Sequence, residues 1–309
     1  MISLDKETLV RLNKKNNLIA TFWLILHFIF FLSFFAISIK YLFLNNFLLF
    51  TIFYLISGFI SSFTGLCGAT HEFYHNTVFE NRKINKFFYR FLCILNFINY
   101  EYNSISHKLH HKHNSYDELD SEKSIEKISY LDLILNLTIN FPNLINRSKY
   151  LILNAAGIFP NSITNNFVKG TEIEKKTTHA ARIIIAYYFI TISFSTFLNV
   201  THIYLLFIIT PFAMNFWVDM ISRAQHYGLE KNSNNIFETT RTVYLNKILT
   251  FLNWNMNYHV EHHLYPTVPF YNLGKLNSLV HKNKPETSKE TLSKFIKLLF
   301  KNNFFAVKN

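Results

Sequence analysis

The chain has 309 residues, half of them hydrophobic, with 34 phenylalanines, 16% charged residues and a mean hydropathy of +0.11. This mean hydropathy is too high for a typical soluble enzyme and too low for a transporter embedded throughout, so a few spanning helices joined to a polar part are expected. The net charge is +12, but its lysines and arginines flank apolar runs, which indicates an anionic membrane surface and argues against nucleic acid.

Two cysteines occur, Cys67 and Cys93, and no C-x-x-C pair exists. A disulfide framework, a zinc ribbon and a rubredoxin-type iron site are therefore not expected on this chain. We find no internal repeat, Gly/Ser-rich linker or low-complexity tract, so residues 1–309 are predicted to form a single domain.

The first predicted element is a membrane hairpin. Residues 18–39 form an apolar run long enough to cross about 30 Å of hydrocarbon, and a second run covers residues 47–69. The first run is too long for the core of a signal peptide and no small-residue cleavage site follows, so we expect a retained anchor. Only Lys40 lies at the turn, whereas the open ends are rich in basic residues and are predicted to face the cytoplasm. These basic residues are Lys6, Arg11, Lys14, Lys15, Arg82, Lys83 and Lys86.

The next apolar stretches are too short or too interrupted to span. Residues 87–99 include Arg90, and an interfacial or re-entrant helix is predicted there. Residues 130–159 contain several asparagines, a proline, an arginine and a lysine, so no crossing is expected in this region either.

A second hairpin is predicted over residues 183–198 and 203–221, with Pro211 expected to kink the last helix. Arg182 and Arg223 mark its cytoplasmic ends. Four crossings with both termini inside is the simplest topology.

The predicted fold is therefore an all-α integral membrane protein, with four transmembrane helices in two hairpins. A cytoplasmic helical cap comprises residues 70–182 and 222–309. Residues 292–301 carry an apolar helical face, which suits either a helix on the membrane surface or a helix packed on the cap. A multi-pass protein of a bacterial inner membrane is expected, with its active site in the cytoplasm.

Histidine clusters dominate the candidate functional residues. HEFYH contains His71 and His75, HKLHH contains His107, His110 and His111, and HVEHH contains His259, His262 and His263. Residues three and four apart share a helical face, so each cluster is predicted to aim its imidazoles in one direction, as a transition metal requires. Chance would give H-x-x-x-H about 0.6 times but H-x-x-H-H only about 0.03 times, so the two H-x-x-H-H boxes carry the argument.

The predicted topology places all eight box histidines on the cytoplasmic side, where they can meet. His226, just after the fourth predicted span, can join them; a histidine that interacts with the dipole of a helix end is the alternative. His113 would point away from its neighbours on a helix and is expected beside the site or on the surface.

Eight or nine imidazoles exceed the coordination number of one ion, so two metals are predicted. Without thiolates and with few carboxylates, the set excludes calcium and magnesium and disfavours iron–sulfur clusters, while zinc, copper, iron and nickel all suit imidazole. Glu72 and Glu261 lie inside the boxes, and each could accept the second N–H of a ligand histidine.

The order HEFYH, HKLHH and NYHVEHHLYPTVP resembles the membrane fatty acid desaturase superfamily, which also includes alkane and sterol hydroxylases and carotenoid ketolases. The strongest local resemblance, WNMNYHVEHHLYPTVPFYNL at residues 254–273, is to the fatty acid desaturase branch, as is TTRTV at residues 239–243. The resemblance covers the three boxes and the four-span plan, hence most of the chain.

The resemblance implies two iron ions held by histidine, O2 as co-substrate, and removal of hydrogen from an unactivated C–H bond of a fatty acyl chain on a lipid, CoA or carrier. It implies that His226 is a further ligand. Acyl-CoA desaturases place an asparagine that holds a metal-bound water four residues before that histidine, but this chain has Ser222 there. Ser222 and Asp219 are expected around the ligands, and no catalytic residue beyond the ligands is needed.

The implied substrate is a membrane lipid or acyl chain, guided to the metals by a dry apolar tunnel. The chain has no HPGG-type haem motif and no rubredoxin-like cysteines, so a separate electron donor is expected. A ferredoxin, rubredoxin or cytochrome with its reductase would serve.

Two other functions remain alternatives to a desaturase. A di-iron hydroxylase or oxygenase of an alkyl, terpenoid or other lipid shares the scaffold, and product mass separates it from a desaturase. A membrane metal transporter, or a haem protein held by two helices, would need polar residues or facing histidines within the spans. The spans offer little beyond His27, Asn215 and Asp219.

Overall fold

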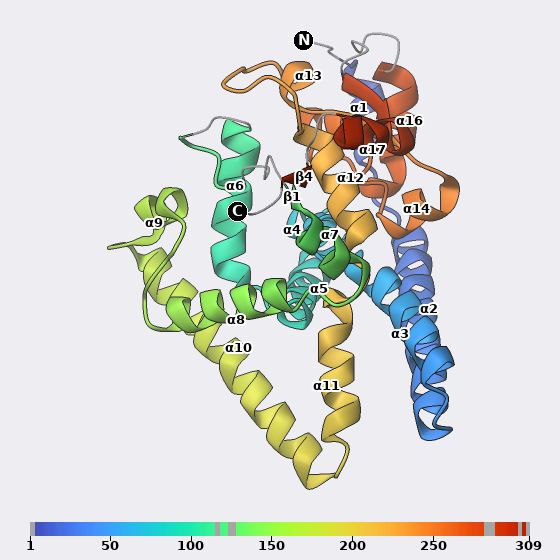
Figure 1. Cartoon of the computed structure of the whole chain (residues 1–309). Helices are drawn as coiled ribbons and strands as arrows, with labels where there is room; N and C mark the ends of the chain where they lie inside the picture. Colours follow the sequence, from blue (N-terminus) through green and yellow to red (C-terminus); the bar gives the residue numbers. More distant parts are fainter. Residues whose placement is uncertain (1–3, 115–117, 123–127, 281–287, 302–304, 307–309) are drawn as a thin grey trace.

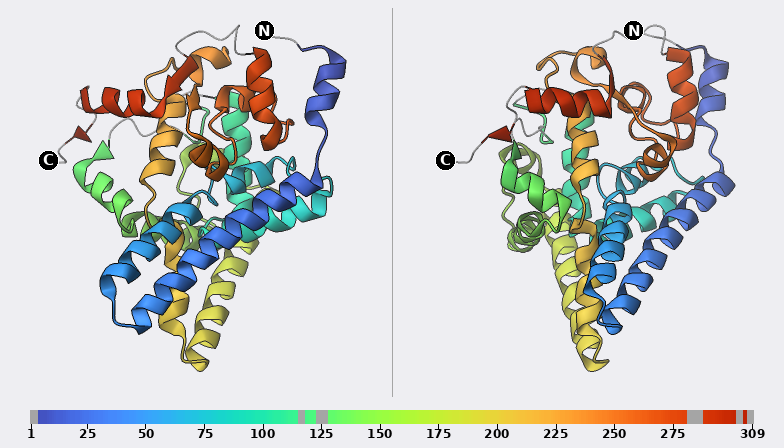
Figure 2. Two further views of the ribbon diagram at one scale, coloured as in Figure 1. Left: turned by 90° about the vertical axis from the view of Figure 1, so that its right-hand side faces the viewer. Right: turned by 45° about the vertical axis from the view of Figure 1, so that its right-hand side comes forward.

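The computed structural model describes all residues except 1–3, 115–117, 123–127, 281–287, 302–304 and 307–309, and it is mostly helical (Figure 1). Two helical hairpins project to one side, and the remaining elements gather at the other (Figure 2). This arrangement separates an apolar portion of the chain from the portion that carries the histidine boxes.

The first hairpin pairs α2 (Asn17–Phe43) with α3 (Phe47–Ser62) and follows the short helix α1 (Lys6–Asn13). Asn45 takes a positive φ of 55° at the turn, a conformation that asparagine tolerates better than most residues. The side chain of Asn46 then caps α3 by accepting from the Leu49 N–H.

Helix α3 ends at Ser62, earlier than the predicted span of residues 47–69. The chain turns there and starts again as α4 (Ala69–Tyr74). Gly68 permits the turn, because a Cβ at this position would overlap the carbonyl oxygen of Phe63. The break matters for the site, since α4 carries the first histidine box in a new direction.

The second hairpin pairs α10 (Glu172–Phe197) with α11 (Thr201–Ile209), and Asn199 takes φ 58° at its turn. The predicted last span, residues 203–221, is interrupted. A 3-10 turn, η1 (Thr210–Phe212), contains Pro211, and α12 (Phe216–His226) begins only after it. Proline lacks the N–H that a continuing helix needs, so Pro211 ends α11 where a kink was predicted.

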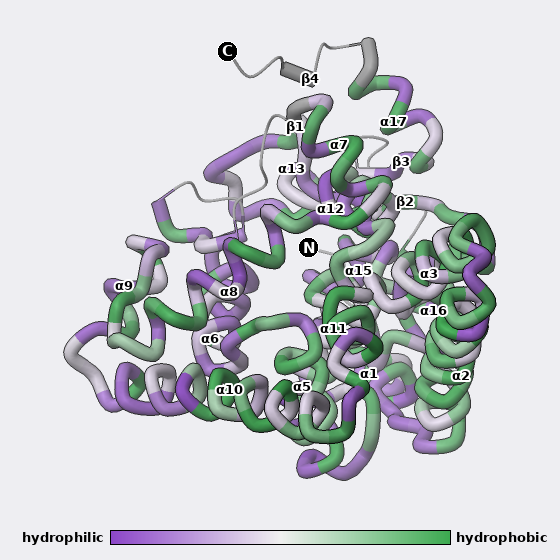
Figure 3. Tube along the Cα trace, turned by 60° about the horizontal axis from the view of Figure 1, so that its bottom comes forward, coloured by the Kyte–Doolittle hydropathy of each residue, from purple (hydrophilic) through white to green (hydrophobic). Residues whose placement is uncertain are grey.

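By length and composition, α2 and α10 can each cross a membrane, whereas the apolar helices α3 and α11–η1 are shorter. Large apolar side chains point outward along both hairpins, among them Phe22 and Ile29 on α2 and Phe189, Ile190 and Phe194 on α10. Viewed from the side to which the hairpins project, α2 and α11 are coloured largely hydrophobic (Figure 3). Such outward faces suit a lipid environment.

The other elements form the body of the molecule. They are α5 (Arg82–Leu95), α6 (Tyr100–His113), β1 (Ile128–Ser129), α7 (Tyr130–Leu137), α8 (Phe141–Ala155), α9 (Ser162–Val168), α13 (Ile236–Thr239), β2 (Thr242–Tyr244), α14 (Lys247–Leu252), α15 (His259–Leu264), α16 (Phe270–Val280), β3 (Lys289–Thr291), α17 (Leu292–Lys301) and β4 (Phe305–Ala306). Strands β2 and β3 pair in parallel, with Val243 opposite Glu290, and β1 pairs in parallel with β4.

Helix α17 packs on the body, which decides between the two alternatives left open by its sequence. Its apolar face is buried, with Phe295 and Leu299 both 0% exposed. The same core cluster contains Met220 and Ile221 of α12. A helix lying on the membrane surface would instead leave this face for lipid.

Trp254 anchors the third histidine box to the first. Its side chain is fully buried, with ring centroids 4.8 Å from Phe270 and 5.8 Å from Phe73 of α4. Trp254 and Asn255 both take positive φ, and Asn255 Nδ2 donates to the Phe270 carbonyl at 3.0 Å. This turn holds the start of α15 beside α4.

Candidate metal centre

Four helices bring their histidines to one place in the body of the molecule. The helix α4 supplies the first box, α6 the second, α15 the third, and α12 ends at His226. All nine histidines are buried or half-buried. The structure thus gathers the nine residues that the sequence singled out as candidate ligands.

The nine imidazoles form two groups among the residues that the structure describes. Within each group the potential ligand atoms all lie within 4.8 Å of one another. The first group is His71, His75, His107, His111 and His262, and the second is His110, His226, His259 and His263. The groups adjoin, since the rings of His111 and His263 have centroids 4.6 Å apart.

Each H-x-x-H-H box contributes to both groups, a finer arrangement than the single direction predicted. His107 and His111, four residues apart, enter the first group, whereas His110 enters the second. In the third box the roles are exchanged, because His259 and His263 enter the second group and His262 the first. Successive helical residues diverge by about 100°, so an adjacent His-His pair addresses two sites.

The Nε2 atoms of the second group lie so close together that hydrogen bonds cannot account for all of their contacts. His259 Nε2 lies 3.0 Å from His226 Nε2 and 3.1 Å from His263 Nε2. One ring nitrogen carries either a proton or a lone pair, so at most one of these contacts is a hydrogen bond. His226 Nδ1 lies 3.0 Å from the Thr239 carbonyl, which only accepts, so the proton of neutral His226 belongs on Nδ1 and its Nε2 offers a lone pair.

The first group repeats this pattern. His262 Nε2 lies 2.9 Å from His71 Nε2 and 3.1 Å from His111 Nε2, and His75 Nε2 lies 3.1 Å from His107 Nε2. His71 Nδ1 contacts the Leu66 carbonyl at 3.1 Å, which again leaves the lone pair on Nε2. Convergent imidazole lone pairs are the donor set of a transition metal, so both groups fit one.

Two carboxylates orient histidines of the second box, and neither was predicted from the sequence. Asp120 approaches His110 Nδ1 at 2.9 Å, and Glu122 approaches His107 Nδ1 at 3.1 Å. Each accepts the Nδ1 proton and turns Nε2 toward the centre, the usual second contact of a metal-ligating histidine. The acidic run DELDSE (residues 117–122), so soon after the box, was the available signal.

The two predicted carboxylates lie elsewhere around the centre. Glu72 is buried, with Oε1 3.8 Å from His262 Nδ1, which is longer than a hydrogen bond. Glu261 is also buried and accepts from the Thr242 hydroxyl at 2.6 Å and from Asn277 Nδ2 at 2.9 Å. Glu261 thereby ties α15 to β2 and α16.

Burial keeps most of these imidazoles neutral. Desolvation, followed by repulsion from neighbouring histidines, holds the pKa of His71, His259 and His263 well below the ordinary value. Burial likewise lowers the pKa of His226 to about 4. Although burial opposes it, the hydrogen bond to Asp120 raises the pKa of His110. Neutral imidazole is the form that binds metals.

The remaining predicted residues surround the centre without joining either group. His113 ends α6 and is half-exposed. Asp219 Oδ2 pairs with Arg223 Nε at 2.8 Å, one turn along α12. Ser222 lines a cavity of about 600 Å³, together with Asp219 and the Cys67 segment that leads into α4. This cavity is lined mainly by polar residues, unlike the apolar tunnel expected from the sequence.

Comparison with models of known protein families identifies the family to which this chain is similar. The family model for the fatty acid desaturases matches residues 45–292, which is most of the chain and includes all nine histidines. No curated protein matches the chain.

Proposed function

Because the chain belongs to the fatty acid desaturase family, we propose that it is a membrane di-iron oxidoreductase that introduces a double bond into a fatty acyl chain with O2. The observation that carries this proposal is the pair of adjoining imidazole groups with converging Nε2 atoms. A family of oxidoreductases and a site for two metals together support this chemistry better than either does alone.

The nine histidines would hold the two irons, five at one ion and four at the other. When bound, the irons activate O2 and supply the oxidant that an unactivated C–H bond requires, which zinc does not. Asp120, Glu122 and the carbonyls of Leu66 and Thr239 fix the ring orientations through Nδ1. Burial excludes water from most of the ligand atoms.

The chain would lie in the membrane through its two hairpins. Both project to the same side and expose apolar side chains, which suits insertion of α2, α3, α10 and α11 from the cytoplasmic face. The body with its histidines would then lie on the cytoplasmic side, close to the lipid. Exposed apolar residues on α7 and α8, such as Ile134, Phe141 and Ile145, fit a position at the interface.

Electrons would come from a separate donor, a ferredoxin, rubredoxin or cytochrome with its reductase. The sequence contains neither an HPGG-type haem motif nor a cysteine set of its own for this purpose. The positive net charge of the chain would attract an acidic donor.

Hydroxylation of a lipid is the second candidate. The polar lining of the cavity beside the centre favours it, because this cavity would accommodate an oxygen-bearing product. Both reactions begin with removal of a hydrogen, so the site geometry is compatible with either.

To test this proposal, the full chain is expressed in a host that has a competent electron donor. The cellular lipids made with wild type and with each variant are then compared by mass spectrometry. Wild type should yield a product lacking two hydrogens, whereas a gain of one oxygen would establish the hydroxylase. His262→Ala should abolish the product, and His113→Ala, outside both groups, should retain it. Absence of any lipid product from wild type, or purified protein without iron, would refute the proposal.

A further inference from the structure

Residues 239–243, with the sequence TTRTV, run from the end of α13 into β2 and are buried throughout. The three threonines and Val243 are 0% exposed, and Arg241 is 8% exposed. Polar groups are rarely buried without hydrogen-bond partners, so the partners of this segment indicate its role. They lie on α12, on α15 and at the end of α6, the three helices that supply the second group of histidines.

The segment fixes the end of α12, where His226 lies. The Thr239 carbonyl accepts from His226 Nδ1 at 3.0 Å. The backbone N–H of Arg241 donates to the Gln225 carbonyl at 2.7 Å, and its Nη1 donates to the Ala224 carbonyl at 3.0 Å. The last carbonyls of a helix lack partners within the helix, so these donors stabilise its final turn. The ring of His226 is thereby held both directly and through its helix.

The same segment is tied to α15, which carries the third box. The Thr242 hydroxyl donates to Glu261 Oε2 at 2.6 Å, and Glu261 lies inside HVEHH. Just before α15, Val243 N donates to the Asn257 carbonyl at 2.8 Å, and Asn257 Nδ2 donates back to the Val243 carbonyl at 3.0 Å. The third box is therefore placed relative to the segment by three hydrogen bonds.

Asn114 joins this segment to α6. It caps the C-terminus of α6, four residues after His110, and is 5% exposed. Its Nδ2 donates to Thr239 Oγ1 at 2.8 Å and to Thr240 Oγ1 at 2.7 Å. An amide NH2 group has two protons, and these two bonds use both. Because Thr239 also accepts from His226, one asparagine side chain connects the end of α6 with the end of α12.

The two helix ends that Asn114 connects present His110 and His226 to each other. Both histidines belong to the second group, and their ring centroids lie 5.3 Å apart. In the first group the rings are oriented from elsewhere, His71 by the Leu66 carbonyl and His107 by Glu122. Loss of the bonds from Asn114 should therefore disturb the second group before the first.

We propose that Asn114 is a positioning residue, which holds residues 239–243 against α6 and so controls the affinity of the second group for its metal. The inference rests on the proposed function only in taking both groups to hold a metal ion. The four potential ligand atoms of this group lie within 4.8 Å of one another, a spacing that depends on three separate helices. Asn114 acts on this spacing through Thr239 and Thr240 without binding the ion itself.

The first test measures the release of Zn²⁺ from the purified full-length protein during titration with a chelator. Zn²⁺ suits imidazole ligands and is redox-inert, so it probes the two groups whichever metal is bound in cells. Wild type should bind one ion at each group. Asn114→Ala should release one ion at a chelator concentration about 10–100-fold lower than wild type does, and the other at the same concentration as wild type. Release of both ions early, or of neither, would overturn the inference.

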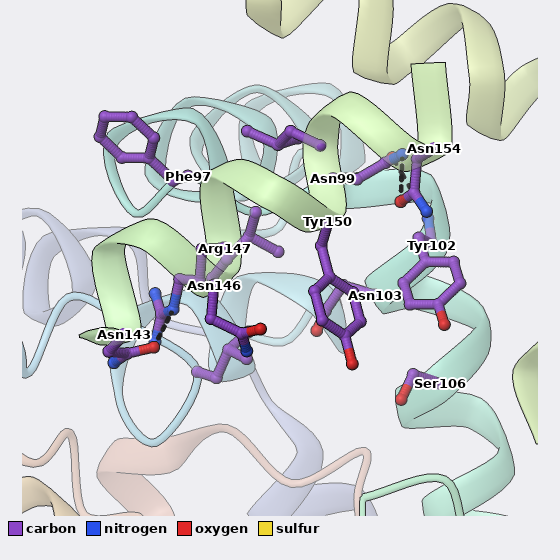
Figure 4. Close-up of a pocket in the computed structure, with 13 residues that line it drawn as sticks. Phe97, Asn99, Tyr102, Asn103, Ser106, Asn143, Asn146, Arg147, Tyr150 and Asn154 are labelled. Atoms are coloured by element: carbon purple, nitrogen blue, oxygen red, sulfur yellow. Dashed lines mark hydrogen bonds between the residues drawn. The ribbon is translucent and has the colours of Figure 1, made fainter. Parts of the chain in front are cut away.

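Asn103→Ala is the matched control for a general loss of stability. Asn103 is another buried asparagine of α6, about three turns earlier, and its Nδ2 donates to the Tyr89 hydroxyl at 3.1 Å. It lines a polar cavity of about 240 Å³ between α6 and α8, which residues 239–243 do not line (Figure 4). Both variants lose a buried hydrogen bond and should lower Tm, but only Asn114→Ala should release one ion early. Early release from both would reduce Asn114 to a structural contact and overturn the inference.

Substitutions of Thr240 test the hydrogen bond itself, including the case in which Asn114→Ala fails to fold. Thr240→Val keeps the branched shape but removes the oxygen that accepts from Asn114, whereas Thr240→Ser keeps this oxygen. The valine variant should release one ion early, and the serine variant should match wild type. Equal release from the two variants would contradict a role for this bond.

A double variant identifies which ion is lost. His263→Ala removes a ligand of the second group, and addition of Asn114→Ala should leave release of the remaining ion unchanged. Earlier release of that ion would show that Asn114 acts on the first group, against the inference. Protein that binds two Zn²⁺ ions but contains no iron when purified from cells would refute the proposed function alone. Equal release from wild type and Asn114→Ala would refute this inference alone.

Discussion

His71 and His262 are separated by 191 positions in the chain, yet their Nε2 atoms lie 2.9 Å apart. The contact joins the first histidine box to the third across the interface of α4 and α15. Burial keeps both rings neutral, so they present nitrogen ligands and not mutually repelling charges. The pairing also shows why the centre depends on the whole fold, since no single box completes either group.

The two groups differ in size, so loss of one ligand should have unequal effects. His75→Ala leaves four histidines in the first group, whereas His226→Ala leaves three in the second. We expect His226→Ala to lose about half of the bound iron and His75→Ala to retain most of it, because four nitrogen ligands still hold an ion. Both side chains are half-buried, which makes them a matched pair. Iron per chain, measured by mass spectrometry, checks this, and equal losses would contradict the assignment of ligands to groups.

Asp120 should contribute to metal affinity without binding the metal. In Asp120→Asn the charge that orients His110 is lost, and metal affinity should fall by about 10–100-fold. Glu118→Gln removes the same charge from an exposed side chain two residues away and should leave affinity unchanged. Competition with a chelator measures the affinity. Equal affinity of the Asp120 variant and wild type would show that the carboxylate does not support the ligand.

Sequence reasoning identified the nine histidines because each carries its own chemistry and their helical spacing is visible in the chain. The partition into two groups follows from the angle between successive helical residues, and could have been predicted for His110 and His111. The roles of Asp120 and Glu122 could not, because their approach to His110 and His107 depends on tertiary contacts that the local sequence does not specify. Acidic residues near a box are only a hint of such contacts.

Two of the predicted spans extend beyond the helices that the structure contains. Apolar composition continued past Ser62, but the helix stops there because the chain must turn to aim α4 at the centre. Composition records solvent preference, whereas a helix end depends on capping and packing. Pro211 was a visible signal of disruption, but its consequence, a helix end and not a kink, depends on the close approach of the next segment. A Cβ on Gly58 of α3 would overlap that of Ala213.

Gly68 should be intolerant of a side chain. A Cβ there would overlap the Phe63 carbonyl oxygen, and backbone cannot move aside as a side chain can. We expect Gly68→Ala to destabilise the protein by about 1–3 kcal/mol and to reduce bound iron, since α4 carries the first box. Gly274→Ala is the control, because its Cβ would meet Tyr258 at an ordinary 3.6 Å inside α16. Thermal unfolding in detergent measures both, and an unchanged Tm for Gly68→Ala would contradict the geometry of this turn.

Helix α17 should stabilise the body through its buried face. Phe295 is 0% exposed and belongs to the same core cluster as Met220 and Ile221 of α12, so Phe295→Ala should cost about 3–5 kcal/mol. Leu298, 38% exposed on the same helix, should tolerate alanine with a change below about 1 kcal/mol. Thermal unfolding compares the two variants.

A membrane-surface role for α17 predicts the opposite pattern. Removing Phe295 or Leu298 would then weaken binding of the C-terminal segment to lipid while leaving Tm unchanged. Limited proteolysis with and without anionic vesicles separates the two cases. If α17 packs on the body, Phe295→Ala accelerates cleavage near this helix equally in both conditions, because the contact that it breaks is made with protein. Protection that appears only when vesicles are present would refute the packed arrangement, since the Met220 and Ile221 cluster lies within the protein and does not depend on lipid.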